Sequence, residues 1–176
     1  MGTANTVYIG VDPGLSGGMA YITCEGIVSV QSMPLTEKDI WMWFQSLALV
    51  FPARENRLVG VIEKVGGYIP RKGKGGTDGQ PGSSIFKFEA NYRGLRMTMI
   101  AAGIPFDEVP PKKWQHEMGV IGSKGETKSQ FKNRLKAKAQ QLYPEERITL
   151  ATCDALLIAR YALKTTTVKS YKKHIR

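Results

Sequence analysis

Five stretches of the chain carry apolar residues in the patterns of β-strands. An apolar run at 6–12 (TVYIGVD) is followed by a Pro-Gly turn and a second run at 17–23 (GGMAYIT). Residues 26–33 (GIVSVQSM) alternate well enough for a third strand after a tight turn. Residues 58–63 (LVGVIE) form the continuous apolar run that is typical of a strand buried inside a sheet. Residues 104–109 (IPFDEV) predict a short fifth strand.

Helical patterns lie between and after these strands. Thr36 is predicted to cap the first helix, with Asp39 at the third position of a capping box. Within that helix Trp41, Phe44 and Leu47 are expected to be core residues. The other predicted helices are 84–102, a brief helix opened by Pro110-Pro111 that carries Trp114, 127–143, and about 151–164.

These elements predict an α/β fold in a single domain. Three strands that can pair as antiparallel hairpins come first and β-α-β crossings follow, which favours a mixed five-stranded sheet with helices on both faces. We place the domain at 1–164 and treat 165–176 as a basic C-terminal tail that the sequence allows to be disordered. The stretch at 66–84 is Gly-rich and basic, and so long a loop inside a domain is usually functional or disordered.

Composition points to a class of partner. The 176 residues include 25 Lys and Arg against 15 Asp and Glu, which gives a net charge of +10. This balance favours a polyanion, usually nucleic acid, although ribosomal, membrane-surface and merely basic proteins share it. With no apolar run near the roughly 18 residues of a membrane span and no signal-peptide pattern, we expect a cytoplasmic protein. Cys24 and Cys153 lack metal-type spacing and are expected to be buried, reduced thiols.

Three carboxylates stand at the ends of apolar elements. Asp12 ends the first strand, Glu63 ends the run at 58–63, and Asp154 lies in the apolar start of the last helix. A lone buried carboxylate loses several kcal/mol of hydration, and clustered carboxylates also repel unless cations lie between them. If the first and fourth strands are neighbours, their ends bring Asp12 and Glu63 together, and a helix packed across that edge can add Asp154. Carboxylates without His or Cys suit Mg²⁺ or Mn²⁺, as in two-metal phosphodiester hydrolysis.

Each of these acids also has an ordinary explanation when it is taken alone. Asp12-Pro-Gly can be a simple turn, Glu63 can pair with Lys64, and Asp154 can be a favourable charge at a helix N-terminus. The occurrence of all three at the ends of apolar elements in a strongly basic chain favours the metal site.

Two basic segments are candidates for DNA contacts. In the helix at 127–143 one face carries three lysines spaced by four residues, Lys128, Lys132 and Lys136. The adjacent face is apolar and is expected to be buried; it consists of Phe131, Leu135, Ala139 and Leu142. Such lysines are usually solvated, but like charges at this spacing repel and a polyanion would relieve the repulsion. The loop at 66–84 adds Arg71, Lys72 and Lys74, with Tyr68 either wedging into opened base pairs or anchoring the loop.

Five motifs in order resemble a known family. They are GVDPGLSGGMAYI, VIEKV, EANYRGLRMTMIAAGIPFDEVPPKKW, GSKGETKSQ and CDALLIARYA. Together they span roughly 6–164, and the chain is similar to the RuvC-like Holliday junction resolvases of the RNase H-like superfamily, especially those of bacteria and bacteriophages. Each motif is loose by itself, but five in this order are fairly specific.

The resemblance implies a Mg²⁺-dependent endonuclease of DNA recombination and repair that cuts four-way junctions, and other branched DNA, in pairs. Asp12, Glu63 and Asp154 would hold two Mg²⁺ ions, for which Mn²⁺ can substitute, and products would carry 5′-phosphate and 3′-hydroxyl ends. Lys128 falls where the family has a lysine beside the active site, and Lys112 or Lys113 matches a basic position near the scissile phosphate. The family works as a homodimer paired through the helix that is here 84–102.

One position departs from the family pattern. The family usually has a fourth ligand, Asp or His, three residues before the last acid, and here that residue is Ala151. Water, Thr152 or an acid from elsewhere would have to complete the shell. Cys153, next to Asp154, is expected to be a small core residue rather than a ligand or nucleophile. Gly17 and Gly18 are expected to leave space for the DNA backbone beside Asp12.

Two other functions remain open from the sequence. Ala151 also fits a DNA-architectural protein that binds junctions with weak or no nuclease activity. DPGLSGG could instead be the phosphate-binding turn of a sugar-kinase-like or actin-like ATPase, but such proteins need a second similar domain, for which 176 residues leave no room.

Overall fold

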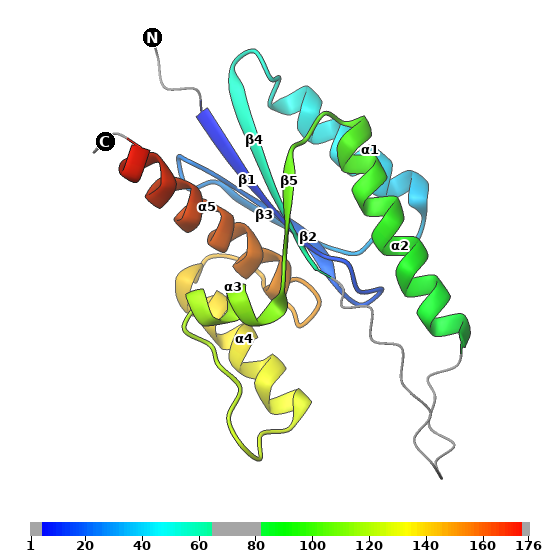
Figure 1. The fold of residues 1–176 in the computed structure, drawn as a ribbon, viewed down its shortest axis with the longest axis vertical. Coiled ribbons are helices and arrows are strands. Elements are labelled where there is room, and N and C mark those ends of the chain that lie inside the picture. The colour runs from blue at the N-terminus through cyan, green and yellow to red at the C-terminus, as the bar shows by residue number, and fades with distance from the viewer. Residues whose placement is uncertain (1–4, 65–81, 174–176) are drawn as a thin grey trace.

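The computed structural model describes residues 5–64 and 82–173, and these form three layers, with a twisted sheet between two groups of helices (Figure 1). The sheet contains β1 (Asn5–Asp12), β2 (Gly18–Thr23), β3 (Val28–Ser32), β4 (Asn56–Glu63) and β5 (Phe106–Val109). Their order is β3-β2-β1-β4-β5. The first three strands pair antiparallel, whereas β4 runs parallel to both β1 and β5. The predicted mixed five-stranded sheet is confirmed.

Helices cover both faces of this sheet because its strands alternate between two cores. On one side, α1 (Glu37–Val50) and α2 (Gly82–Ala101) pack on Val7, Ile9 and Val11 of β1. On the other side lie α3 (Pro111–Glu117), α4 (Lys128–Leu142) and α5 (Cys153–Lys173), which pack on residues such as Tyr8. Successive side chains of β1 point to opposite faces of the sheet, so this one strand packs against both helical layers.

Helix α5 lies directly on the backbone of β1. A Cβ atom added at Gly10 would collide with the carbonyl oxygen of Ala155 and the backbone nitrogen of Ala159, both in α5. Only glycine allows so close an approach. Since Asp12 ends β1 and Asp154 opens α5, this contact sets the position of one acid relative to the other.

Several local predictions are confirmed and others need correction. Thr36 caps α1, since its Oγ1 accepts a hydrogen bond of 3.1 Å from the backbone nitrogen of Asp39. Trp41, however, is 49% exposed, because it lies on the solvent side of that helix. Cys24 is exposed just after β2, whereas Cys153 is buried as expected. Helix α5 continues to Lys173, beyond the predicted end at 164. Within the described ranges, no helix is long and apolar enough to span a membrane.

Candidate active site

The sheet topology brings two of the three acids to one edge. Strands β1 and β4 are parallel neighbours, and Val11 lies opposite Ile62. The next residues, Asp12 and Glu63, are the last residues of these strands and therefore lie side by side. Asp154 joins them from the first turn of α5, which packs across β1. The convergence that the sequence predicts from strand ends is therefore present in the fold.

The turn after Asp12 is held by hydrogen bonds from three directions. The backbone nitrogen of Gly14 donates to Asp12 Oδ1 over 3.2 Å, and that of Gly17 donates to the Gly14 carbonyl over 2.8 Å. Asn91 of α2 donates to the carbonyl of Pro13 over 2.7 Å. Pro13 and Gly14 thus form a fixed turn that orients the carboxylate of Asp12.

The two glycines after this turn serve packing rather than DNA clearance. A Cβ at Gly17 would collide with the backbone and carboxylate of Asp12 itself. A Cβ at Gly18 would meet the carbonyl oxygens of Gln31 and Ala151. The space that was expected to admit the DNA backbone is filled by the protein.

Burial and the charges of neighbouring acids make Asp12 and Glu63 hard to ionise. Burial raises the pKa of Asp12, and the nearby Asp154 raises it further, against the lowering effects of Lys132 and the Gly14 N–H. Burial, with the charge of Asp12, also raises the pKa of Glu63 to about 7. Ionised acids at this edge therefore favour an added positive charge.

Lys132 supplies such a charge from α4. Its Nζ lies 2.5 Å from Asp154 Oδ2 and 3.9 Å from Asp12 Oδ2. Burial lowers the pKa of Lys132, but the two carboxylates outweigh it, so that the pKa is raised and the ammonium stays charged. Sequence reasoning placed Lys128 beside the acids and Lys132 on a DNA-contacting stripe. The structure instead leaves Lys128 exposed at the first position of α4 and puts Lys132, one turn later, against the acids.

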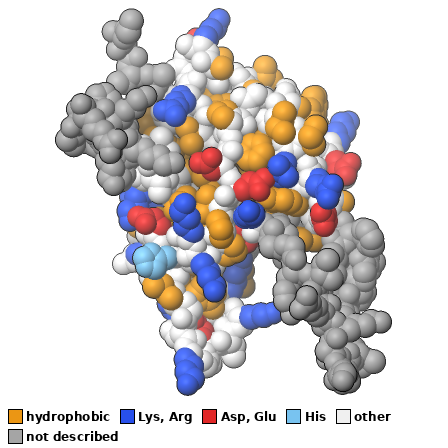
Figure 2. Space-filling model, viewed as in Figure 1, with side chains coloured by type: hydrophobic (Ala, Val, Ile, Leu, Met, Phe, Trp, Pro, Cys, Tyr) orange, Lys and Arg blue, Asp and Glu red, His pale blue; other side chains and the backbone are white. Residues whose placement is uncertain are grey.

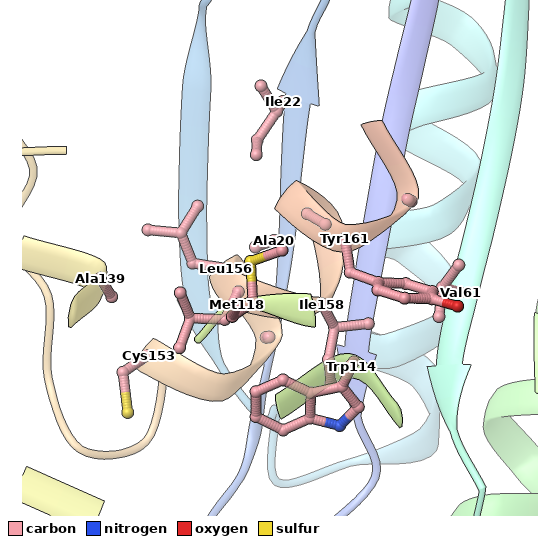
Figure 3. Close-up of a cluster of buried hydrophobic side chains, with 14 of the residues drawn as sticks. Ala20, Ile22, Val61, Trp114, Met118, Ala139, Cys153, Leu156, Ile158 and Tyr161 are labelled. Carbon is pink, nitrogen blue, oxygen red and sulfur yellow. The ribbon is translucent and has the colours of Figure 1, made fainter. Parts of the chain in front are cut away.

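Trp114 is a site residue that sequence reasoning did not identify. Its Nε1 donates a hydrogen bond of 2.7 Å to Glu63 Oε2, and its ring is fully buried. Figure 3 shows it next to Ile158 of α5, in the core cluster on that side of the sheet. The available signal was its place in a short helix that directly follows β5, the neighbour of β4.

The segment around Ala151 provides no replacement carboxylate. Thr152 Oγ1 accepts a hydrogen bond of 3.0 Å from the backbone nitrogen of Thr149 and lies 3.2 Å from the Thr149 hydroxyl, so it is committed to the start of α5. The Cys153 thiol donates to Asp154 Oδ1 over 3.2 Å. Burial, with the charge of Asp154, raises the pKa of Cys153 to about 12, which keeps the thiol protonated.

The remaining predicted DNA contacts form no ion pair with the three acids within the described ranges, or lie outside those ranges. Lys112 and Lys113 are exposed in the first turn of α3, and Lys136 is half-buried on α4. On the face in Figure 2, Lys and Arg side chains are interspersed with Asp and Glu rather than forming a patch of one sign. Four predicted contacts fall outside the described residues: Tyr68, Arg71, Lys72 and Lys74.

No protein-family model matches the chain, and no curated protein matches it. Solved structures, however, do match it. The structure of Thermus thermophilus RuvC in complex with a Holliday junction substrate matches with a TM-score of 0.56 and 15% identity, over 93% of this chain and 96% of that one. The chain has the RuvC fold. A second Thermus thermophilus RuvC structure agrees, with a TM-score of 0.51 and 15% identity over 92% and 97% of the two chains.

The expected RNase H-like architecture is thus confirmed, since the RuvC match extends over almost the whole of both chains. At 15% identity the RuvC likeness concerns the fold. The chemistry of this edge of the sheet has to come from its own residues.

The donor set at this edge of the RuvC fold suits a hard cation. Among residues 5–64 and 82–173, no three His, Cys, Asp or Glu side chains are gathered as a ready-made metal site. The three acids nevertheless offer only oxygen donors, which Mg²⁺ and Mn²⁺ prefer. Lys132 pairs with Asp154 and Asp12, but in the described part of the chain no ion pair reaches Glu63. When it is ionised, the carboxylate of Glu63 therefore has no ion-pair partner within the described ranges.

Proposed function

We propose that the protein is a metal-dependent endonuclease that resolves four-way DNA junctions and cuts related branched DNA. The observation that carries this proposal is the meeting of Asp12, Glu63 and Asp154 with Lys132 at one edge of a RuvC-fold sheet. The net charge of +10 supports a DNA substrate, because phosphate contacts dominate the affinity of such proteins for nucleic acid. The Thermus thermophilus protein with this fold was solved with a Holliday junction substrate.

In this proposal Asp12, Glu63 and Asp154 hold Mg²⁺, with Mn²⁺ as a substitute. When bound, the ion supplies Lewis-acid stabilisation of the charge that develops on the scissile phosphate. The acids come from two strands and a helix of one packed core, which fixes their spacing before substrate arrives. The Gly14 N–H and the turn at Pro13 orient Asp12, and Trp114 orients Glu63.

The chain's own side chains also contribute to the charge balance of hydrolysis. Trp114 occupies Oε2 of Glu63, which leaves Oε1 as a ligand for the ion, and a pKa of about 7 means that Glu63 has to lose its proton near neutral pH before it takes this role. The water oxygen bonds to phosphorus as the bond to the 3′ oxygen breaks. The attacking water gives up a proton to solvent and the 3′ oxygen takes one up from solvent, so the products carry 5′-phosphate and 3′-hydroxyl ends. The Lys132 ammonium can contact a phosphate oxygen.

We further infer a homodimer that pairs through α2, which would present two sites to the symmetric strands of a junction. Met97 is 63% exposed and Ile100 is 58% exposed on this helix, whereas Met99 is buried against the sheet. The exposed apolar side chains therefore lie on the face of α2 that the core does not use.

A junction-cleavage assay tests the proposed function. Four-way junctions with each strand labelled in turn are incubated with purified protein and Mg²⁺ or Mn²⁺, beside linear duplex of the same sequence. We expect paired, religatable nicks in opposite strands of the junction and little cutting of the duplex. Asp12→Asn should abolish nicking without loss of binding. Absence of nicking across metals and sequences, or unchanged nicking by the variant, would reject a nuclease.

The same assay decides between this proposal and a junction-binding protein without catalysis. Ala151 favours that alternative, because it removes one potential ligand from the site. Salt-sensitive junction binding together with complete absence of nicking would establish it.

A further inference from the structure

We propose that Lys132 serves as a permanent second cation in the carboxylate cluster, so that each chain takes up one divalent ion rather than two. This inference rests on the proposed function, because it concerns the metal content of the same site. It replaces the expectation of two ions per site.

The position of the ammonium carries the proposal. Nζ of Lys132 bridges two of the three acids, at 2.5 Å from Asp154 and 3.9 Å from Asp12. Asp154 is nearly buried, and its other oxygen, Oδ1, accepts a hydrogen bond from the Cys153 thiol. Both oxygens of Asp154 are therefore engaged by donors of the chain itself. A metal ion that used both would have to displace Lys132 and break the contact with Cys153.

The backbone of α4 fixes where Lys132 can reach. The helix begins at a capping box in which Thr127 and Gln130 bond reciprocally, and its Leu135 and Ala139 are buried in the core. These anchors hold the face of α4 that carries Lys132 toward the start of α5. The lysine is half-buried there, with a side chain 32% exposed, so the ion pair is not a loose surface contact.

Charge neutrality then limits the number of ions. The three carboxylates carry three negative charges when ionised, and Lys132 neutralises one of them. A single divalent ion neutralises the other two. A second divalent ion would leave the cluster with a net charge of +2, which a largely buried site stabilises poorly without further ligands. Ala151 supplies no carboxylate, and the Thr152 hydroxyl is engaged with Thr149.

The acids that remain available point to the place of the single ion. Asp12 and Glu63 end neighbouring parallel strands. Trp114 occupies one oxygen of Glu63, which leaves the other for a ligand. These two acids are therefore the main ligands that we assign to the ion, with Asp154 shared between the ion and Lys132.

Counting bound Mn²⁺ tests the proposal without reference to catalysis. Full-length protein is titrated with Mn²⁺ in the absence of DNA, and free Mn²⁺ is followed by electron paramagnetic resonance, with calorimetry as a second measure. We expect one ion per wild-type chain. Lys132→Met should admit a second ion, or bind the first about tenfold more tightly, because a nearby positive charge is removed. Lys138→Met is the matched control, since this lysine lies on the same helix and its Nζ contacts Gln141 rather than the acids; it should bind Mn²⁺ as wild type does.

Further variants keep the test decisive. Lys132→Arg preserves the charge and should keep one ion per chain. Circular dichroism shows whether Lys132→Met is folded, so that an effect of the lost charge can be told from an effect of unfolding. Two ions per wild-type chain, or identical ion counts and affinities in a folded Lys132→Met and in Lys138→Met, would overturn the proposal. If wild type binds two ions and still cuts junctions, only this inference fails. If it binds no Mn²⁺ and cuts no junction, the proposed function fails with it.

Discussion

The indole nitrogen of Trp114 donates a 2.7 Å hydrogen bond to Oε2 of Glu63, and it does so from a ring with no solvent exposure. Helix α3 carries the tryptophan and β4 carries the acid, so this bond connects the core to the proposed metal ligands. A buried donor to a carboxylate favours its ionised form. The bond lowers the pKa of Glu63, against burial and Asp12, which raise it.

Replacement of Trp114 by phenylalanine should make the proposed cleavage more dependent on alkaline pH. The ring still fills most of its site, but the donor is gone, so the pKa of Glu63 rises above its present value of about 7. The acidic limb of the pH–rate profile for junction cleavage should shift to higher pH. Trp43→Phe, on α1 across the sheet, is the control. A profile that keeps its midpoint while only the rate falls would show that Trp114 has a packing role alone.

The metal-free protein should lose stability as the pH rises toward neutrality. Burial and Asp12 raise the pKa of Glu63 from 4.5 to about 7, so the folded state binds this proton more tightly than the unfolded state. The resulting stabilisation is complete below pH 4.5 and disappears as the pH passes 7, on the order of 3 kcal/mol at most.

Melting temperatures in chelator between pH 5 and pH 8 measure this effect. Glu63→Gln cannot ionise, so its melting temperature should vary less over this range and should exceed that of wild type at pH 8. The exposed Glu145→Gln is the matched control. Parallel curves for wild type and Glu63→Gln would contradict a buried, repelled carboxylate at this position.

The sequence predicts the framework of the site better than its details. Asp12 and Glu63 could be paired in advance, because each ends an apolar strand and parallel neighbours bring their ends together. The choice between Lys128 and Lys132 could not be made. Both lie on one face of α4, and only the way that this helix packs against α5 decides which lysine reaches Asp154. The role of Trp114 could not be predicted either, because its hydrogen bond to Glu63 joins residues 51 apart in the chain and depends on tertiary packing.

The glycines show a similar limit. A glycine in a strand indicates close backbone approach, but the pattern does not say what approaches. At Gly10 it is helix α5, and at Gly17 it is the carbonyl oxygen and the carboxylate of Asp12. Local patterns therefore locate tight contacts, whereas the identity of the partner depends on tertiary packing.

Substitution of Gly10 by alanine should destabilise the fold severely. The new methyl group would collide with backbone atoms of Ala155 and Ala159, which cannot rotate away, so α5 would have to move off β1. We expect a loss of roughly 3 kcal/mol or more in urea unfolding, at the upper end for single substitutions. Gly94→Ala is the control, because nothing lies within 4 Å of its added methyl group. That variant should be neutral or up to about 1 kcal/mol more stable, as expected for alanine in a helix. Equal stability of the two variants would contradict the close packing of α5 on β1.

Charged residues on the outer face of α2 should separate the inferred dimer. Met97→Glu combined with Ile100→Glu places two negative charges where apolar side chains are now exposed, and a self-complementary interface would bring four of them together. Light scattering after size-exclusion chromatography should give the mass of two chains for wild type and of one for the double variant. Paired nicking of junctions should then become single, uncoordinated nicking.

Leu49→Glu, at an 81% exposed position on α1, is the control for added surface charge and should leave the mass of the dimer unchanged. A wild-type mass of one chain, or dissociation by Leu49→Glu instead, would remove α2 as the pairing surface.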